Sequence, residues 1–269
     1  MTLMTLKTST PLVSVIIPIY NGAHFVREAL ESVLSQNYAP IEIIVVDDGS
    51  TDASSTIIQQ FGSRIQCCFQ KNSGTAVARN KGVILSHGEY LAFLDQDDVW
   101  HHSKLAAQIH AFASDINLDA VFGYTQQFQD MEMSIPRDQP VPLSLKTIPG
   151  ISPSGMLIQR KAFDQVGPFD SQWVLGEWAD WYLRAVDSGL RIKVKKDIVV
   201  YRRIHANNKG RVFVNCRNEY VRILKLSLDR RRSVLLRENL VENLEKRPIA
   251  MEEMPRTPLV VPNWNMYGI

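Results

Sequence analysis

The sequence predicts an α/β fold in which helices cover both faces of a doubly wound, mostly parallel sheet. Short β-branched runs, such as VSVIIP at residues 13–18 and IEIIVV at residues 41–46, are continuously apolar, as in strands that are buried on both faces. Segments with apolar residues at helical spacing alternate with these runs. Such β-α-β-α order is typical of parallel sheets with right-handed crossovers.

The elements of the first half follow this alternation closely. Asn21-Gly22 supplies the turn before the first helix, and we expect Ser50 or Thr51 to cap the second. The predicted strands cover residues 13–18, 41–46, 65–69 and 90–94, and the predicted helices cover residues 24–36, 51–61, 75–86 and 105–113.

The second half is less regular. Residues 131–153 contain five prolines, which predicts a long loop or flap over a site. We expect strands at residues 120–124, 155–159 and 192–202, a turn at 163–170, a helix at 177–186 and one or two helices within 212–245. The predicted organisation is one domain at residues 11–210, a C-terminal helical extension at 211–247 and a flexible tail at 248–269.

Composition narrows the possible partners. The 269 residues include 30 Lys and Arg against 28 Asp and Glu, and the net charge of +2 does not indicate a nucleic-acid surface. Three cysteines lack a metal-ligand spacing and suit a reducing compartment, where we expect them to be buried thiols.

Location follows from the same composition. No stretch reaches the ~18 apolar residues of a transmembrane helix, so the expected location is the cytoplasm, with the inner face of the membrane as an alternative. The run Arg230-Arg231-Arg232 is either a peripheral contact with anionic lipid or a solvated helix face.

The most informative feature is the tetrad Asp95-Gln96-Asp97-Asp98, which directly follows the apolar run at residues 90–94. Carboxylates this close repel one another, and a hard cation such as Mn²⁺ or Mg²⁺ relieves that repulsion. The alternative is a solvated acidic turn before the helix near Ser103. The turns after Pro18, Val46 and Leu94 all lie at the carboxyl edge of the predicted sheet, where ligands of such folds bind.

Four segments in this order, P-I-Y-N, D-D-G-S-T-D, NSGTAVARNKG and FLDQDD, resemble the family 2 glycosyltransferases of the GT-A fold. The resemblance runs from Val13 to about Asn208. It implies an enzyme that transfers a sugar, with inversion, from a nucleotide-diphospho-sugar to a saccharide or lipid-linked acceptor. It also implies a requirement for Mn²⁺ or Mg²⁺.

The resemblance assigns the donor side of the site to residues from several strand ends. Tyr20 would form a wall for the base, unless it is a core tyrosine, and Asp48 would lie beside the base. Asp97 would hold the metal with Asp95 and with His205 of Y-R-R-I-H-A-N-N, and Asp98 would orient Asp97. The implied nucleotide-binding residues are Pro18, Tyr20, Asp47, Asp48, Arg79 and Asp95, with Asn80 near the ribose and Arg202 and Arg203 candidates for closing over the diphosphate.

The acceptor side departs from the family pattern. Relatives commonly carry adjacent Glu-Asp, the Asp being the general base, whereas here Trp178 follows Glu177. Either Asp180 or Glu177 would then act as the base, and Asp180 is favoured, although it could instead pair with Arg184 at i, i+4. We expect Gly155, Trp178 and Trp181, with Trp173, to lie on the sugar or acceptor side.

Other functions fit the residues less well. D-Q-D-D-V also resembles the signature of aspartyl-phosphate phosphohydrolases, but that signature belongs on the first strand of its domain. A nucleotidyltransferase would need a Gly-rich, basic loop after the first strand, which residues 21–24 lack. The altered base region leaves a non-catalytic sugar-nucleotide-binding protein as a further alternative.

Overall fold

The computed structural model describes residues 10–129, 146–205, 208–212, 214–216 and 218–245. The predicted tail and most of the predicted flap lie outside these residues. The elements in chain order are β1 (Val13–Ile19), α1 (Val26–Leu34), β2 (Ile41–Asp47), α2 (Ser54–Gln59), the 3-10 helix η1 (Gly62–Arg64), β3 (Gln66–Phe69), α3 (Thr75–Leu85), β4 (Tyr90–Phe93), β5 (Val99–Trp100), α4 (Lys104–Ser114), β6 (Ala120–Gln129), β7 (Thr147–Pro149), η2 (Pro153–Gly155), β8 (Met156–Gln159), α5 (Arg160–Val166), α6 (Glu177–Asp187), β9 (Ile192–Ile204), α7 (Lys209–Val212), η3 (Val214–Cys216) and α8 (Asn218–Glu245).

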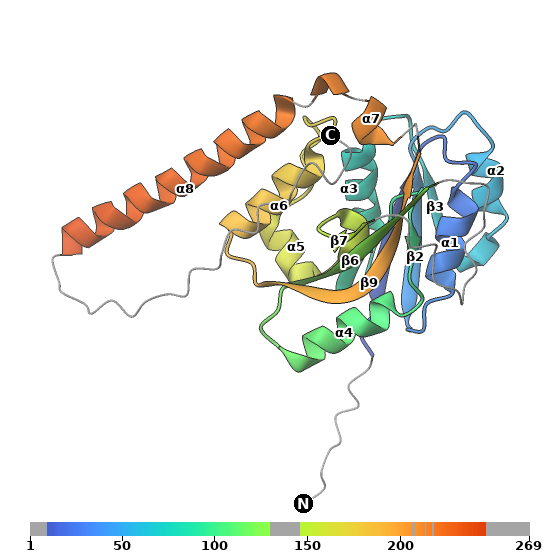
Figure 1. Ribbon diagram of the computed structural model, residues 1–269, viewed down its shortest axis with the longest axis horizontal. Coiled ribbons are helices and arrows are strands. Elements are labelled where there is room, and N and C mark those ends of the chain that lie inside the picture. Colours follow the sequence, from blue (N-terminus) through green and yellow to red (C-terminus); the bar gives the residue numbers. More distant parts are fainter. Residues whose placement is uncertain (1–9, 130–145, 206–207, 213, 217, 246–269) are drawn as a thin grey trace, which may run out of the picture.

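The strands form one mixed sheet in the order β3-β2-β1-β4-β8-β6-β9-β5, with β7 paired to β6 (Figure 1). The first four are parallel, with Ile17 opposite Val45 and Ile16 opposite Phe93. Strand β8 is antiparallel to both β4 and β6, whereas β9 is parallel to β6. The predicted fold class is confirmed, and the parallel arrangement holds through the first half of the sheet.

Alternation along β1 divides the core into two layers. Val13, Val15, Ile17 and Ile19 belong to a cluster that includes residues of α1, α2 and α4. Ile16 belongs to a second cluster on the opposite face, with residues of α3, α5 and α6. Helices therefore cover both faces of the sheet, as the doubly wound pattern predicts.

Several local predictions were wrong. Helix α2 begins at Ser54 without a side-chain cap, because the hydroxyl of Ser50 accepts from the Asn21 amide instead. Helix α5 replaces part of the predicted turn at residues 163–170. Strand β5 was missed because it has only two residues, and Cys67 is exposed because β3 is the edge strand.

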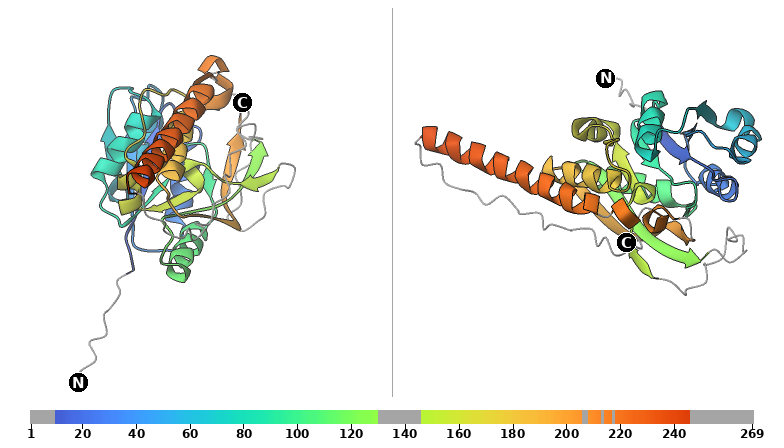
Figure 2. Two further views of the ribbon diagram at one scale, coloured as in Figure 1. Left: turned by 90° about the vertical axis from the view of Figure 1, so that its left-hand side faces the viewer. Right: turned by 90° about the horizontal axis from the view of Figure 1, so that it is seen from above.

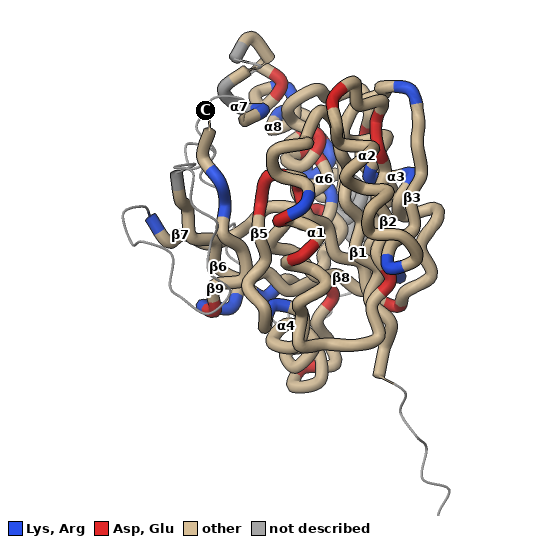
Figure 3. The backbone as a smooth tube through the Cα atoms, turned by 90° about the vertical axis from the view of Figure 1, so that its right-hand side faces the viewer, with Lys and Arg blue, Asp and Glu red and all other residues tan. Residues whose placement is uncertain are grey.

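Helix α8 lies beside α6 and then projects away from the rest of the chain (Figures 1 and 2). Basic and acidic residues of the described chain are intermixed over the face in Figure 3. Among the described residues, no helix combines the length and the apolar character needed to cross a bilayer.

Candidate functional site

The turns after β1, β2 and β4 are joined by hydrogen bonds at the carboxyl edge of the parallel strands. Gln96 accepts from the Tyr20 amide at 2.8 Å and donates to the Tyr20 carbonyl at 3.0 Å. Asn21 Oδ1 accepts from the Thr51 amide at 2.8 Å, and Asp52 accepts from the Ala23 amide at 3.0 Å. The convergence of these turns, predicted from the strand ends, is confirmed.

Asp47 and Asp48 are both buried and both hold backbone in place. Asp47 Oδ1 accepts from the Ser50 amide at 2.8 Å, and its other oxygen accepts from the Ser55 hydroxyl. Asp48 accepts from the amides of Ser73 and Gly74, each at 2.8 Å, and from the Gln70 side chain at 2.8 Å. Asp48 thus fixes the segment that leads into α3, and its place beside a base stays a prediction.

Tyr20 and Pro18 occupy contrasting environments. The Tyr20 side chain is 46% exposed, which excludes a core tyrosine and leaves an aromatic face open at the carboxyl edge. Pro18 is buried within β1, opposite Val46 of β2. Pro18 can therefore shape the strand end, whereas the Tyr20 side chain is accessible from solvent.

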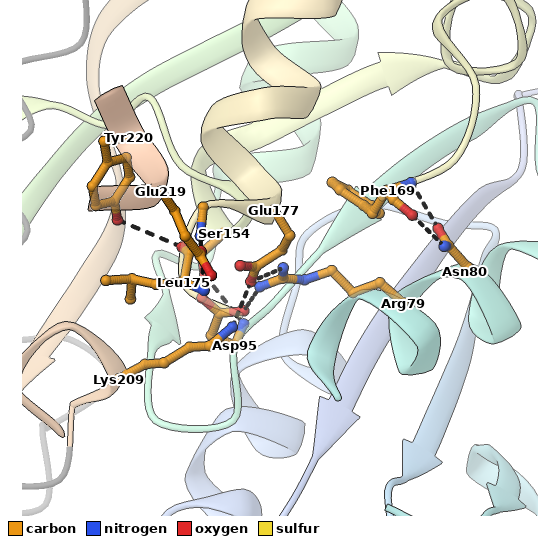
Figure 4. A network of polar contacts seen from close by, with 11 residues as sticks. Arg79, Asn80, Asp95, Ser154, Phe169, Leu175, Glu177, Lys209, Glu219 and Tyr220 are labelled. Atoms are coloured by element: carbon orange, nitrogen blue, oxygen red, sulfur yellow. Dashed lines mark hydrogen bonds and ion pairs between the residues drawn. The ribbon is translucent and has the colours of Figure 1, made fainter. Parts of the chain in front are cut away.

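An ion-pair network centred on the buried side chains of Arg79 and Glu177 links α3, the turn after β4, α6 and α7 (Figure 4). Arg79 donates to Asp95 at 2.6 Å and to Glu177 at 3.2 Å, and Lys209 donates to the same Glu177 oxygen at 2.8 Å. Burial would lower the pKa of Arg79, but the charges of Asp95 and Glu177 raise it above its usual value. The guanidinium therefore stays charged and holds the two carboxylates at a fixed separation.

Two atoms of this network lack a hydrogen-bond partner among the described residues. They are Nε of Arg79 and Oε2 of Glu177, and both are buried. An unpartnered buried carboxylate oxygen is costly and calls for a missing partner, such as water or a ligand group. Glu177 therefore has an acceptor site that no described residue fills.

Asp97 forms the second carboxylate centre of the edge. Its Oδ2 lies 2.9 Å from Nε2 of His205 and 3.1 Å from Nδ2 of Asn208. The structure therefore brings together Asp97 and His205, which the sequence proposed as metal ligands. Asp95 is turned toward Arg79 instead.

The chemistry of this donor set suits a divalent cation whose coordination is completed by other ligands. Within the described residues, no group of three or more His, Cys, Asp and Glu side chains is arranged to hold a metal ion. Mg²⁺ is commonly held by one or two carboxylates together with water and substrate phosphates. Asp97 and His205, with Asp95 nearby in sequence, fit such a site.

Asp98 is buried below this centre. Burial, followed by the charges of Asp97 and Asp95, raises the pKa of Asp98 well above its usual value. Ser154 is fully buried, hydrogen-bonds Asp98 and accepts from the Asp95 amide at 3.1 Å. Ser154 therefore joins η2 to the acidic turn.

The two candidate bases point to different partners. Asp180 is buried and accepts from Arg184 Nε at 2.8 Å, the i, i+4 pair that was the alternative to a catalytic role. Arg184 also donates to the carbonyls of Val166 and Pro168, each at 2.7 Å. Asp180 thus anchors the loop before α6, while Glu177 faces Asp95 through Arg79.

The prediction of a tryptophan surface for a sugar was wrong. Trp173, Trp178 and Trp181 are 4%, 8% and 1% exposed. Trp178 and Trp181 stack at 5.5 Å between ring centroids, and their indole N–H groups donate to the carbonyls of Ile151 and Gly167. Trp178 and Trp181 form part of the core between α6 and the sheet, with their N–H groups satisfied there, whereas Trp173 belongs to a separate cluster with Ile223 of α8.

Three further residues that the sequence proposed for the site have structural roles. A Cβ on Gly155 would lie 2.1 Å from the Gly150 carbonyl oxygen, so glycine is required there by the chain itself. Asn80 exchanges two hydrogen bonds with the Phe169 backbone, at 2.7 and 2.9 Å. Arg203 is buried, pairs with Glu28 and lies over Phe128, so it is not placed to close over a diphosphate.

Sequence reasoning missed three residues of the site. Gln96 was noticed only as part of the tetrad, although it joins two turns. Lys209 and Asn208 were not assigned because they follow β9, 32 residues after Glu177 and 111 residues after Asp97 respectively, the carboxylates that they contact. Their position directly after the His205 segment was the available signal.

The fold and the carboxylates at this sheet edge define the GT-A class. The chain matches the model of Glycosyl transferase family 2 over residues 14–167, more than half of its length. The chain therefore belongs to glycosyl transferase family 2.

Relatives agree with this assignment. A glycosyltransferase of Rickettsia felis is 30% identical over 91% of this chain and 41% of its own length. The glycosyltransferase alr2836 of Nostoc sp. is 34% identical over 73% of this chain and 66% of its own length. The chain thus spans less than two thirds of either relative.

Solved structures share the fold. TarS 1-349 of S. aureus, in complex with UDP-GlcNAc, has a TM-score of 0.65 and 21% identity, covering 81% of this chain and 66% of its own. The mannosyltransferase PcManGT of Pyrobaculum calidifontis, in complex with GDP-Man and Mn²⁺, has a TM-score of 0.58 and 21% identity over 76% of this chain and 60% of its own.

Proposed function

We propose that the chain is a metal-dependent glycosyltransferase that moves a sugar from a nucleotide-diphospho-sugar to an acceptor hydroxyl. The observation that carries the proposal is the pair of carboxylate centres at one sheet edge, Asp95 held by Arg79 and Asp97 held by His205 and Asn208. Family membership supports it. The catalytic unit would be residues 11–210, with residues 211–247 as a helical extension and 248–269 as a tail.

The donor would bind beside the exposed ring of Tyr20 and along the acidic turn. An aromatic face suits a nucleobase, and the turns around Asp47 and Asp48 would set its position. TarS and PcManGT, which share the fold, are described with UDP-GlcNAc and GDP-Man. A nucleoside diphosphate donor therefore fits this edge. The acceptor would be a saccharide or lipid-linked saccharide.

The metal would be Mn²⁺ or Mg²⁺, held by Asp97 and His205, with Asp95 alongside. PcManGT is described with Mn²⁺, which supports this choice. When bound, such an ion neutralises charge on the departing nucleoside diphosphate. The chain's own contribution is to orient Asp97, through Asn208, and to keep Asp95 in place through Arg79.

Of the two candidates, we propose Glu177 as the general base. Its Oε2 has no partner among the described residues, whereas Asp180 is bonded to Arg184 within α6. Removal of the acceptor proton by Glu177 as the hydroxyl attacks the anomeric carbon would give inversion. The burial of Trp178 at the usual base position favours one rival, a non-catalytic sugar-nucleotide-binding protein.

Metal-dependent donor binding is tested by calorimetry with UDP, GDP, dTDP and CMP, with and without Mn²⁺. The preferred nucleotide should bind at least about tenfold more weakly after EDTA or in Asp97→Asn, because one ligand of the ion is lost. Asp164→Asn is a matched control, since Asp164 is exposed on α5. Equal binding with and without metal would refute the metal site.

The base is tested by comparing Glu177→Gln with Asp180→Asn. Glu177→Gln should lower transfer to the acceptor by about 10²–10⁴-fold while donor binding changes little, the usual effect of losing a general base. Asp180→Asn should act mainly on stability, because it weakens the pair with Arg184. Donor hydrolysis is measured in parallel. A larger loss of transfer in Asp180→Asn would return the role to Asp180, and wild-type binding without turnover would support the non-catalytic rival.

The compartment is also a proposal. Three free cysteines suit the reducing cytoplasm, and a lipid-linked acceptor would bring the enzyme to the inner face of the membrane.

A further inference from the structure

Helix α8 is attached to the rest of the chain mainly through polar groups. Glu219 accepts from the amides of Val174, Leu175 and Gly176 at 3.1, 2.9 and 3.0 Å, in the loop just before α6. At the other end of α6, Asp187 accepts from α8, and its partners are Ser227, Arg230 and Arg231, at 2.7–3.1 Å. Ile223 is the apolar residue of α8 that is buried within this contact.

One side of α8, next to its contact with α6, carries a line of exposed apolar residues, and Leu226, Val234 and Leu236 are exposed off this line. Val221, Leu224, Leu228 and Leu235 are 71%, 37%, 55% and 59% exposed. Their spacing of three, four and seven residues places them along one line of the helix, which we call the outer stripe. A helix that turns polar groups toward its own protein and leucines outward has a face suited to an apolar partner.

Basic residues flank the outer stripe. Lys225 and Arg232 are exposed, and each lies four residues after a stripe residue, Val221 and Leu228 respectively. They therefore line the same edge of the stripe. Arg230 and Arg231, by contrast, are held by Asp187. Of the run Arg230-Arg231-Arg232, only Arg232 is exposed, so the run is not a uniformly solvated helix face.

We propose that the outer stripe of α8 is a docking surface for an anionic lipid membrane. A helix with an apolar stripe and flanking Lys and Arg lies in the interface of a bilayer, where leucines enter the acyl boundary and cations meet lipid phosphates. An antiparallel pairing of the stripes of two copies fits less well, because it would bring Lys225 and Arg232 of both copies to the same edge. The proposal does not depend on the proposed enzymatic function.

Helix α8 also contacts the loop that precedes the proposed base. Glu219, at the start of α8, holds the loop that leads into Glu177 of α6. Val221, at the start of the outer stripe, lies toward the end of α6 that carries the proposed base. Leu228 and Leu235 lie beside and beyond Asp187, at the other end of α6.

Sedimentation with vesicles tests the apolar part of the proposal. The full chain should bind vesicles made of equal parts phosphatidylcholine and phosphatidylglycerol. Leu228→Gln with Leu235→Gln should bind at least about tenfold more weakly, because two side chains no longer enter the lipid. Ile84→Gln with Ile116→Gln is the matched control, since these isoleucines are 77% and 85% exposed on other parts of the chain.

The charged part is tested with Lys225→Gln and Arg232→Gln. This double variant should also bind at least about tenfold more weakly, and wild-type binding should fall with added salt and with pure phosphatidylcholine. Lys81→Gln with Lys161→Gln, both exposed elsewhere, is the control. Circular dichroism checks that every variant is folded.

Three outcomes would overturn the proposal. The first is absence of binding to the anionic vesicles. The second is equal loss of binding in the stripe variants and their controls. The third is a concentration-dependent dimer that dissociates in Leu228→Gln with Leu235→Gln, which would make a second copy the occupant of the stripe.

Discussion

Lys104 is a buried lysine beneath the acidic turn, and its protonation should be visible in the stability of the protein. Its side chain is fully buried, donates to Gln108 Oε1 at 2.7 Å and to the Met156 carbonyl at 3.1 Å, and lies 4.2 Å from the centre of the Trp100 ring. Gln108 in turn donates to the Gly155 carbonyl at 2.8 Å. This pair therefore supports the segment that carries Ser154.

Burial lowers the pKa of Lys104 well below its usual value of 10.5. Between that lowered pKa and the unfolded value, the unfolded chain holds a proton that the folded chain has released. Stability should therefore rise with pH across this window, by up to about 1.4 kcal/mol per pH unit. Below the lowered pKa both states are protonated, so the penalty for burying the charge is fully present.

Lys104→Met removes the amine and keeps most of the volume. We expect the difference in free energy of unfolding between wild type and Lys104→Met to change with pH, since the variant lacks this titration. At neutral pH, loss of the two hydrogen bonds would cost about 1–3 kcal/mol and would be offset by relief of the buried amine. The pH dependence of the difference is the decisive quantity, because other titrations cancel in it.

Urea unfolding at a series of pH values from neutral to about the normal lysine pKa measures this difference. Lys81→Met, which changes an exposed lysine of α3, is the matched control and should give a curve parallel to that of wild type. Parallel curves for wild type and Lys104→Met would refute the reasoning, because they would show that Lys104 keeps its proton when buried.

Two further predictions concern the backbone around the site. Asp48→Asn should lower the free energy of unfolding by about 1–3 kcal/mol, because an amide cannot accept from Gln70, Ser73 and Gly74 as the carboxylate does. Urea unfolding with no measurable loss would contradict this. Gly155→Ala should lower the melting temperature, with a cost of about 1–3 kcal/mol, because the new methyl group would meet the Gly150 carbonyl oxygen at 2.1 Å. An unchanged melting temperature would mean that the backbone relaxes freely there.

The parallel half of the fold was predictable because its strands are short, continuously apolar and separated by amphipathic helices. Each of β1, β2 and β4 lies between covering layers, so its residues carry a strong signal. Strand β5 has two residues and pairs with β9, about 100 positions later, so no local pattern marks it. The antiparallel direction of β8 depends on its neighbours β4 and β6 rather than on its own residues.

The positions of the site residues were predictable for the same reason, but their partners were not. Strand ends meet at one edge of a parallel sheet, so the convergence of Tyr20, Asp48 and Asp97 follows from topology. Whether a carboxylate oxygen already accepts a hydrogen bond from the protein depends on the conformation of the loops. Sequence patterns do not predict that conformation. Asp48 illustrates this, since all the described hydrogen bonds to its carboxylate come from residues 70–74.

In helix α6, the helical spacing of the carboxylates does not predict their interaction partners. Glu177 and Asp180 are three residues apart, so a helical wheel puts them on one side. Arg184, one turn after Asp180, forms an ion pair with Asp180 within the helix. Glu177 lies in the first turn and pairs with Arg79 of α3 and Lys209 of α7. The i, i+4 pair was visible in the sequence, but the contacts of Glu177 needed the tertiary structure. Both carboxylates are buried and only Glu177 faces the donor-side cluster, which is why we propose Glu177, rather than Asp180, as the group that activates an acceptor.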